Sequence, residues 1–292
     1  MPGIHAASLS VNLTGGCNAQ CPYCIATATW KTGAHDNSGI EERIPVACRY
    51  AAFHGVDTVL ITGSGEPLLP KNQRLVLSIL DTTRGVGIPT TEVQTNGQVL
   101  AENPVYRGAL KDHGLNTVAI SVSSPDPKQS AALVKISVDY LDLARALADM
   151  RFMVRISLNM SEEECLPLVH QGGLAAYADT LRDAGVSQLT LRELGVPSNP
   201  LNTPTAATRI QWVRDHALDP AKVQDLHQEV IRNGHPLRRL PYGPMVYDYH
   251  GLSVAVATCM TETTDPTMIR SLILQPDGGV YHDWNYRGSR LI

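Results

Sequence analysis

The chain has 292 residues, of which 43% are hydrophobic, so it is long enough to bury one substantial core. Its net charge is -4, and no run of Lys or Arg would track phosphates, which excludes a general nucleic-acid surface. The start, Met1–His5, lacks the basic and apolar parts of a signal peptide. No stretch approaches the roughly 18 continuous apolar residues of a membrane span. We therefore expect a cytoplasmic protein that binds neither nucleic acid nor membrane.

The chain begins with a strand that runs into a loop rich in cysteine. Residues 6–12 partly alternate apolar and polar side chains, as a half-buried strand does, and Thr14, Gly15 and Gly16 form a turn into the cysteine loop. Apolar residues with helical spacing follow at 40–55, and residues 56–62 predict the next strand. This β-α-β unit puts the cysteine loop at the carboxyl end of a strand.

The same alternation continues along the chain and predicts an α/β fold. Six strands separated by helices indicate a partial (β/α)6 barrel of the TIM type, in which catalytic groups gather at the carboxyl ends of the strands. The further predicted segments are a helix at 71–84, a strand at 91–95, a helix at 104–113, a strand at 117–123, a helix at 130–150, a strand at 152–158, a helix at 170–184 and a strand at 187–194.

Prolines and turn formers at 195–208 interrupt this alternation of strands and helices, and we predict a boundary between two parts of the chain there. Residues 1–195 would form the barrel, and residues 196–292 a segment that closes the barrel mouth. Within the second segment we expect a helix over 205–234 and β-rich runs at 246–256 and 269–281, the last with a hairpin turn.

Three of the six cysteines, Cys17, Cys21 and Cys24, lie within one loop. In a cytosolic chain such a group fits a metal site better than a disulfide framework. Thiolates favour zinc or iron–sulfur centres, and a 4Fe-4S cube held by only three cysteines keeps one iron open for another ligand. The loop is therefore predicted to hold a metal cluster.

Further polar candidates follow the next strands. Glycines in a loop let the backbone approach a ligand closely, and a neighbouring carboxylate can accept hydrogen bonds from an ammonium group. Alternate residues of a strand share a face, so Arg192 and Glu193 cannot both point into the barrel, and the sequence leaves open which one does. The candidates are Gly63, Ser64, Gly65, Glu66 and Pro67 after the second strand, Asn96 after the third, Ser121 and Ser123 at the fourth, Arg155, Ser157 and Asn159 at the fifth, and Arg192 at the sixth.

The spacing C-x3-C-x2-C, with Tyr23 before the last cysteine, resembles that of radical S-adenosylmethionine (SAM) enzymes, and the order of the later motifs agrees. In that family the cysteines hold a 4Fe-4S cluster whose open iron chelates the amino and carboxylate groups of SAM. The resemblance implies that the loop at 63–67 holds the SAM amino group, although Ser64 replaces the first glycine of the family's Gly-Gly-Glu-Pro. It also implies that Tyr23 lies near the adenine, and that the polar candidates on the later strands meet the carboxylate and ribose of SAM.

Such an enzyme takes an electron from an external donor such as flavodoxin or ferredoxin, cleaves SAM to a 5′-deoxyadenosyl radical and abstracts a hydrogen atom from its substrate. The late, solitary Cys259 resembles in its position the hydrogen donor of radical SAM epimerases that act on sugar or aminoglycoside natural products. Acidic residues in the tail would suit a small, cationic sugar. We expect epimerisation with Cys259 as a catalytic residue.

Other functions remain open on the sequence. Cys259 could be structural or hold a second cluster in a dehydrogenase, a carbon–carbon bond-forming enzyme, a peptide-modifying enzyme or a glycyl-radical activase. A non-catalytic iron–sulfur electron carrier is the alternative outside enzymes. Cys48 lies on the apolar face of a predicted helix, where a buried structural role is expected, and Cys165 could be exposed or could ligate a second cluster.

Overall fold

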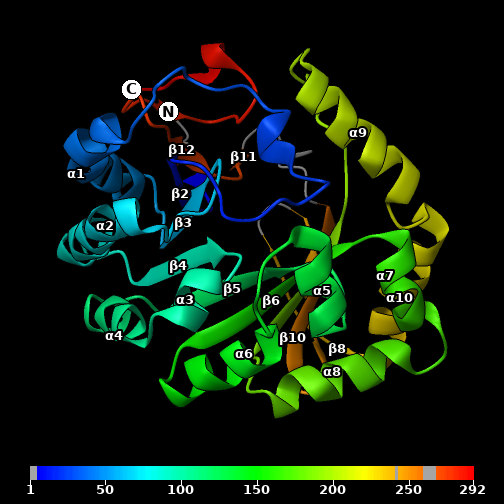
Figure 1. Ribbon diagram of the computed structural model, residues 1–292. Helices are drawn as coiled ribbons and strands as arrows, with labels where there is room; N and C mark the ends of the chain where they lie inside the picture. The colour runs from blue at the N-terminus through cyan, green and yellow to red at the C-terminus, as the bar shows by residue number, and fades with distance from the viewer. Residues whose placement is uncertain (1–4, 241–242, 259–267) are drawn as a thin grey trace.

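The computed structural model describes residues 5–240, 243–258 and 268–292. Its centre is a curved, 11-stranded sheet with helices packed around the outside (Figure 1). In spatial order the strands are β13 (Val280–Tyr281), β12 (Leu272–Leu274), β2 (Leu9–Leu13), β3 (Thr58–Gly63), β4 (Thr90–Thr95), β5 (Thr117–Val122), β6 (Met153–Met160), β7 (Gln188–Glu193), β10 (Leu252–Thr258), β9 (Met245–Tyr249) and β8 (His235–Arg239). A separate pair is formed by β1 (His5–Ala6) and β11 (Met268–Ile269).

The six predicted strands, β2 to β7, are parallel neighbours in chain order, which confirms the barrel-like α/β class. The tail, residues 196–292, adds strands to both edges of this sheet. Its strand β10 pairs in parallel with β7 and its strand β12 pairs in parallel with β2, so eight adjacent strands are parallel instead of six. Both additions are apolar runs that cover the otherwise unpaired edges of β7 and β2.

The predicted hairpin at the end of the chain is confirmed. Strands β12 and β13 are antiparallel, with Ile273 opposite Tyr281 and Leu274 opposite Val280. Gly278 has a φ of 77°, in the left-handed region that favours glycine in a tight turn.

Ten α-helices and three short 3₁₀ helices are present in the described ranges, and none of them is long and apolar enough to cross a bilayer. They are η1 (Ile25–Thr27), α1 (Ser38–Phe53), η2 (Pro70–Asn72), α2 (Gln73–Val86), α3 (Gln98–Glu102), α4 (Pro104–Asp112), α5 (Pro127–Val134), α6 (Tyr140–Asp149), α7 (Glu162–Val169), α8 (Gly173–Asp183), α9 (Pro204–His216), α10 (Pro220–Asn233) and η3 (Arg287–Ser289).

Two predicted helices were wrong in length because a local cap divides each of them. The helix expected at 130–150 is two helices: α5 ends at Val134 and is capped by Lys135, whose φ is 56°, and Asp139 caps α6 through its side chain. The helix expected at 205–234 is α9 and α10. There Asp219 caps the second helix, and Pro220 occupies its first turn.

The sheet is apolar on its helix-covered face and polar on its inner face. In β3 and β4, Val59, Ile61 and Val93 are fully buried. The alternate residues of these strands, including Thr62 and Glu92, line an internal cavity. This arrangement follows from the period of two in a strand, and it places polar side chains among the residues that line a hollow barrel interior.

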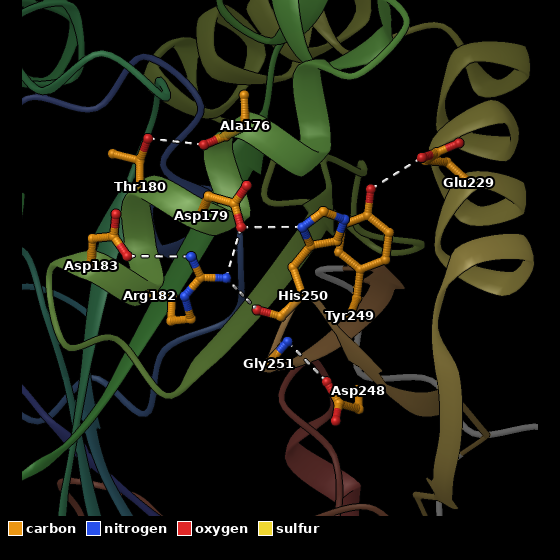
Figure 2. A network of polar contacts seen from close by, with 10 residues as sticks. All are labelled: Ala176, Asp179, Thr180, Arg182, Asp183, Glu229, Asp248, Tyr249, His250 and Gly251. Carbon is orange, nitrogen blue, oxygen red and sulfur yellow. Dashed lines mark hydrogen bonds and ion pairs between the residues drawn. The ribbon is translucent and has the colours of Figure 1, made fainter.

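Polar contacts fix the turn between β9 and β10 to helix α8, as Figure 2 shows. The Nδ1 atom of His250 lies 3.1 Å from the Asp179 carboxylate. The guanidinium of Arg182 donates to Asp179 over 2.7 Å and to the carbonyl oxygen of His250 over 3.1 Å. On the other side, the hydroxyl of Tyr249 donates to Glu229 on α10 over 3.1 Å. These bonds hold the added strands against the predicted barrel.

Candidate active site

The clustered cysteines lie on the loop that follows β2, at the carboxyl end of the sheet. All three are free of disulfides, and Cys17 is exposed. Burial and the neighbouring thiols of Cys24 and Cys17 together raise the pKa of Cys21 to about 12, so the three sulfurs are close enough to interact. The amide of Gln20 donates to the carbonyl oxygen of Val134 over 2.8 Å, which anchors the loop to the end of α5.

The glycine loop after β3 packs backbone to backbone against the cysteine loop. A Cβ atom on Gly65 would lie 1.9 Å from the carbonyl oxygen of Gly16, and one on Gly63 would lie 2.7 Å from that of Leu13. The amide of Glu66 donates to the same Gly16 oxygen over 3.0 Å. Glycine is therefore required at Gly63 and Gly65 because two loops meet there.

The Glu66 carboxylate joins this pair of loops to a third one. It is 3% exposed and accepts hydrogen bonds from the hydroxyl of Thr95 over 2.7 Å, the amide of Leu68 over 3.0 Å and the amide of Asn96 over 2.9 Å. Burial raises the pKa of this carboxyl, and the three hydrogen bonds oppose that rise. Pro67 is buried beside it. Glu66 thus orders the loops, and its contact with a SAM amino group remains a prediction.

Asn96 connects the third loop to the cysteine loop. Its Nδ2 atom donates to Oδ1 of Asn18 over 2.7 Å, while its Oδ1 atom accepts from the amide of Gln98 over 3.0 Å. The loops after β2, β3 and β4 are consequently tied together around the cysteines. This is the arrangement that the order of motifs predicted.

Tyr23 reaches across the loop to the ends of β5 and β6. Its hydroxyl is hydrogen-bonded to that of Ser123, and Asn159 also bonds to it. Burial raises the pKa of Tyr23 well above its ordinary value. Its ring lies 5.7 Å from that of Trp212 on α9, measured between centroids. Helix α9 therefore packs over the cysteine loop, a contact that no sequence pattern indicated.

The polar candidates of β5, β6 and β7 meet in register. Ser121 pairs with Ser157, and Asn159 pairs with Arg192. The hydroxyl of Ser157 is buried and has no hydrogen-bond partner among the described residues. Arg192 lines the internal cavity, whereas Glu193 lines a separate surface depression. The structure thus answers the question that the sequence left open.

Arg155 lies deeper in the barrel, and its guanidinium is already engaged by protein groups. Nη1 is 2.5 Å from the carboxylate of Glu92, and Nε donates to Gln188 over 2.7 Å. Gln94 in turn donates to Glu92 over 3.1 Å. Strand β5 lies between β4 and β6, and its Ala119 pairs with Gln94 on one side and with Arg155 on the other. The small alanine side chain leaves room for Glu92 and Arg155 to meet across β5. The predicted contact of Arg155 with the SAM carboxylate would require this network to open.

The interior of the barrel is a cavity of about 990 Å³, large enough for a small-molecule substrate. It extends from the amino ends of the strands, near Thr58 and Thr90, to the glycine loop, where Gly63 and Ser64 line it. Several of its lining residues were missed at the sequence level. Glu92 and Gln94 carry the same alternating signal as Arg155, but no local pattern marks Trp30, Trp284, Asn285 or Gln275.

The remaining cysteines divide into two kinds. Cys48 and Cys165 are fully buried, and burial raises the pKa of Cys48 to about 11 and of Cys165 to about 12. Both therefore lie in the core, which for Cys165 excludes an exposed thiol. Cys259, the predicted hydrogen donor, lies outside the described residues.

The donor set at the cysteine loop fits an iron–sulfur cluster. Three soft thiols lie on one loop, and the proximity of Cys24 contributes to the raised pKa of Cys17 and of Cys21. Nowhere in the described ranges do three His, Cys, Asp or Glu side chains converge closely enough for a single metal ion. Three thiols that do not converge on one point suit a 4Fe-4S cube, because each thiol binds a different iron at a different corner of the cube. Cys17, Cys21 and Cys24 would hold it.

Comparisons with known proteins agree with this geometry. The sequence profile described as "Radical SAM superfamily" matches residues 11–160, half of the chain. The probable GTP 3′,8-cyclase of Methanocaldococcus jannaschii is 30% identical over 156 residues, which cover 53% of this chain and 48% of that protein. The GTP 3′,8-cyclase of Synechococcus sp. is 34% identical over 125 residues, which cover 43% of this chain and 34% of that protein. The matches thus span less than half the length of these curated relatives.

Solved structures share the fold. SuiB of Streptococcus suis bound to the precursor peptide SuiA has a TM-score of 0.62 at 16% identity, with 96% of this chain and 60% of that chain covered. Coproporphyrinogen III oxidase from Escherichia coli, described as a radical SAM enzyme, has a TM-score of 0.53 at 15% identity and covers 80% of this chain and 52% of its own. The chain therefore belongs to the radical SAM superfamily and shares its cofactors, a 4Fe-4S cluster and SAM.

Proposed function

We propose that this chain abstracts a hydrogen atom from a small molecule held in the barrel cavity, with the cluster on Cys17, Cys21 and Cys24 and with SAM bound beside it. The observation that carries this proposal is that the cysteine, glycine and Asn96 loops are tied together at the carboxyl end of a cavity of about 990 Å³. A packed barrel core would leave no room for a substrate next to the cluster.

When bound and reduced, the cofactors supply a 5′-deoxyadenosyl radical, which removes hydrogen from an unactivated C–H bond. The contribution of the chain is to fix positions and exclude water. Glu66 holds the backbone of the three loops in place, and Tyr23 with Ser123 and Asn159 covers the ends of β5 and β6. Polar side chains along the lumen orient the substrate bond that reacts.

Anaerobic reconstitution followed by a 5′-deoxyadenosine assay tests this function. Reduced, cluster-loaded protein should cleave SAM, and a Cys17→Ser, Cys21→Ser, Cys24→Ser variant should lose both iron and cleavage. A Cys48→Ala variant is the matched control, since that thiol is buried away from the loop and should leave iron content unchanged. Absence of SAM cleavage by the reduced, iron-loaded wild-type protein would instead favour an electron carrier.

The fate of the substrate radical has two candidates. The sequence favours epimerisation of a sugar or aminoglycoside carbon, with Cys259 returning a hydrogen atom to the opposite face. The relatives named GTP 3′,8-cyclase favour a nucleotide substrate that is cyclised. Dehydrogenation and peptide modification remain alternatives, and flavodoxin or ferredoxin remains the expected electron donor in a cytoplasmic setting.

Isotope labelling separates these reactions. Epimerisation through the exchangeable thiol of Cys259 should place one deuterium at the inverted carbon in D2O, and Cys259→Ala should cleave SAM without forming that product. Cyclisation should instead convert GTP to an isomer without a required solvent deuterium, and Cys259→Ala should leave it active. Full epimerase activity in Cys259→Ala would refute the role of this cysteine.

A further inference from the structure

A network of polar contacts fixes the guanidinium of Arg155 in the wall of the cavity. Its Nη1 atom lies 2.5 Å from the Glu92 carboxylate, and its Nε atom donates to Gln188 over 2.7 Å. Each of these two partners is itself held. Glu92 accepts a hydrogen bond from Gln94 over 3.1 Å, and Nε2 of Gln188 lies 3.0 Å from the sulfur of Met153. Groups on β4, β6 and β7 therefore hold the guanidinium in one position before any ligand arrives.

Part of this guanidinium is not used by the protein. The Arg155 side chain is 28% exposed and lines the cavity, whereas the Glu92 side chain is 3% exposed. The Nη2 atom of Arg155 donates to no residue in the part of the chain that the structure describes, and it is not sealed off from the cavity. Nη2 carries two N–H donors, and a charged donor of this kind forms its strongest hydrogen bonds with oxyanions. The cavity wall thus offers a fixed cationic donor.

Stability alone gives little reason for a charged pair in this wall. Removing two charges from water costs free energy that their mutual attraction often only offsets, and replacing such a pair by apolar side chains is often neutral or stabilising. The alternate residues Val93 and Val154 of the same strands show that apolar side chains are used freely on the other face. A pair kept beside the cavity, with two donors left over, is better explained by a ligand that accepts from them.

The other charged side chains of the cavity favour an anionic ligand. Glu92 is already paired with Arg155, and Asp57 is the one further carboxylate among the described lining residues. The further cationic lining residues are Lys31, Arg192, Arg238 and Arg270. The chain as a whole has the opposite sign, with a net charge of -4. A cavity lined mostly by charges of one sign concentrates ligands of the other sign.

Arg155 lies away from the cysteine loop, toward the amino ends of the strands. It precedes Asn159 by four positions on β6, and Asn159 bonds to Tyr23 of the cysteine loop. At about 3.3 Å per residue, the two positions are about 13 Å apart along the strand. A group bound at Arg155 therefore leaves space along the strand for the rest of a small molecule to extend toward the cysteines.

We propose that Arg155 binds an acidic group of the substrate, a phosphate or a carboxylate, through its Nη2 atom, while Glu92 and Gln188 hold the guanidinium for this contact. The site rests on the proposed function, because it assigns the substrate class of the same cavity. It gives Arg155 to the substrate instead of the SAM carboxylate, and the network around it does not have to open. A cationic aminoglycoside is disfavoured as the substrate.

Isothermal titration of cluster-loaded, SAM-bound protein without reductant tests the site by binding alone. The probes share a hexose skeleton and differ in charge: glucose 6-phosphate and glucuronate are anionic, and glucosamine is cationic. An anionic probe should bind saturably and more tightly than glucosamine. The double variant Glu92→Gln, Arg155→Gln should weaken that binding about tenfold, as expected for the loss of a charge-assisted hydrogen bond.

The double variant isolates the guanidinium from the rest of the cavity. It removes one positive and one negative charge, so the net charge of the lining stays the same and neither partner is left as a lone buried charge. Arg145→Gln on α6 is the matched control, because that guanidinium pairs with Asp142 and both side chains are exposed. The control should bind the anionic probe as wild type does. Equal thermal midpoints of the variants and wild type exclude misfolding as the cause of any loss.

The outcomes separate this site from the proposed function. Tighter binding of glucose 6-phosphate identifies a phosphate and tighter binding of glucuronate a carboxylate, and either supports the site if it depends on Arg155, even when the reduced enzyme fails to cleave SAM. Three results overturn it: preferential binding of glucosamine, equal affinity of the double variant and wild type for the anionic probe, or no saturable heat with either anionic probe. A tenfold loss of SAM affinity in the double variant, with anion binding unchanged, would return Arg155 to the SAM carboxylate.

Discussion

Replacing Gly65 with alanine tests the junction that organises the active site. The new Cβ atom would lie 1.9 Å from the carbonyl oxygen of Gly16 and 2.5 Å from its carbonyl carbon, so the cysteine loop has to shift as a backbone unit. The shift also weakens the 3.0 Å hydrogen bond between the Glu66 amide and that oxygen. Overpacking costs about 1–3 kcal/mol and a lost hydrogen bond about 1 kcal/mol, which together give a destabilisation of about 2–4 kcal/mol.

Urea denaturation of the apo protein measures this loss, and iron and sulfide content after anaerobic reconstitution measures its effect on the cluster. Gly85→Ala in α2 is the matched control, because a Cβ atom there meets nothing within 4 Å. That variant should gain up to about 1 kcal/mol from helix propensity and should load iron normally. If Gly65→Ala is as stable as Gly85→Ala and holds as much iron, the two loops are not in the contact described.

Two further predictions address the lumen and the added strands. Glu92→Ala should lower the free energy of unfolding by about 2–4 kcal/mol in urea denaturation, because it leaves the partly buried guanidinium of Arg155 without its carboxylate partner. The double variant with Arg155→Ala should lose less stability than the sum of the two single variants. Additive losses would show that the two side chains do not interact. The hydrogen bond from His250 lowers the pKa of Asp179 in the folded protein below its ordinary 3.8. The ionised Asp179 carboxylate therefore stabilises the fold above pH 3.8, and this stabilisation is lost as the pH falls through the lowered pKa of the folded state. The difference in denaturation midpoint between wild type and Asp179→Asn should therefore shrink below about pH 4, and a difference that is constant with pH would contradict the interaction.

The sequence by itself determined the cysteine loop and the order of the strands behind it. Cys17, Cys21 and Cys24 are close in sequence, so their proximity needs no tertiary structure, and the period of two along β4 and β6 already separates inward polar residues from buried apolar ones. The glycine loop follows the next strand, and parallel neighbours bring their carboxyl ends to one edge. The helix breaks at Lys135 and Asp219 were missed because single capping residues outweighed an apolar pattern that runs on through them.

Only the tertiary structure decided how the tail is used and what lines the cavity. Whether β10 and β12 extend one edge or both depends on hydrogen bonding between strands far apart in the chain, which no local pattern encodes. The pairing of Arg155 with Glu92 and the contact of Trp30 with Tyr281 likewise join distant segments. Local sequence thus specified the loops predicted to hold the cofactors, while long-range packing specified the cavity proposed to hold the substrate, because its walls come from both ends of the chain.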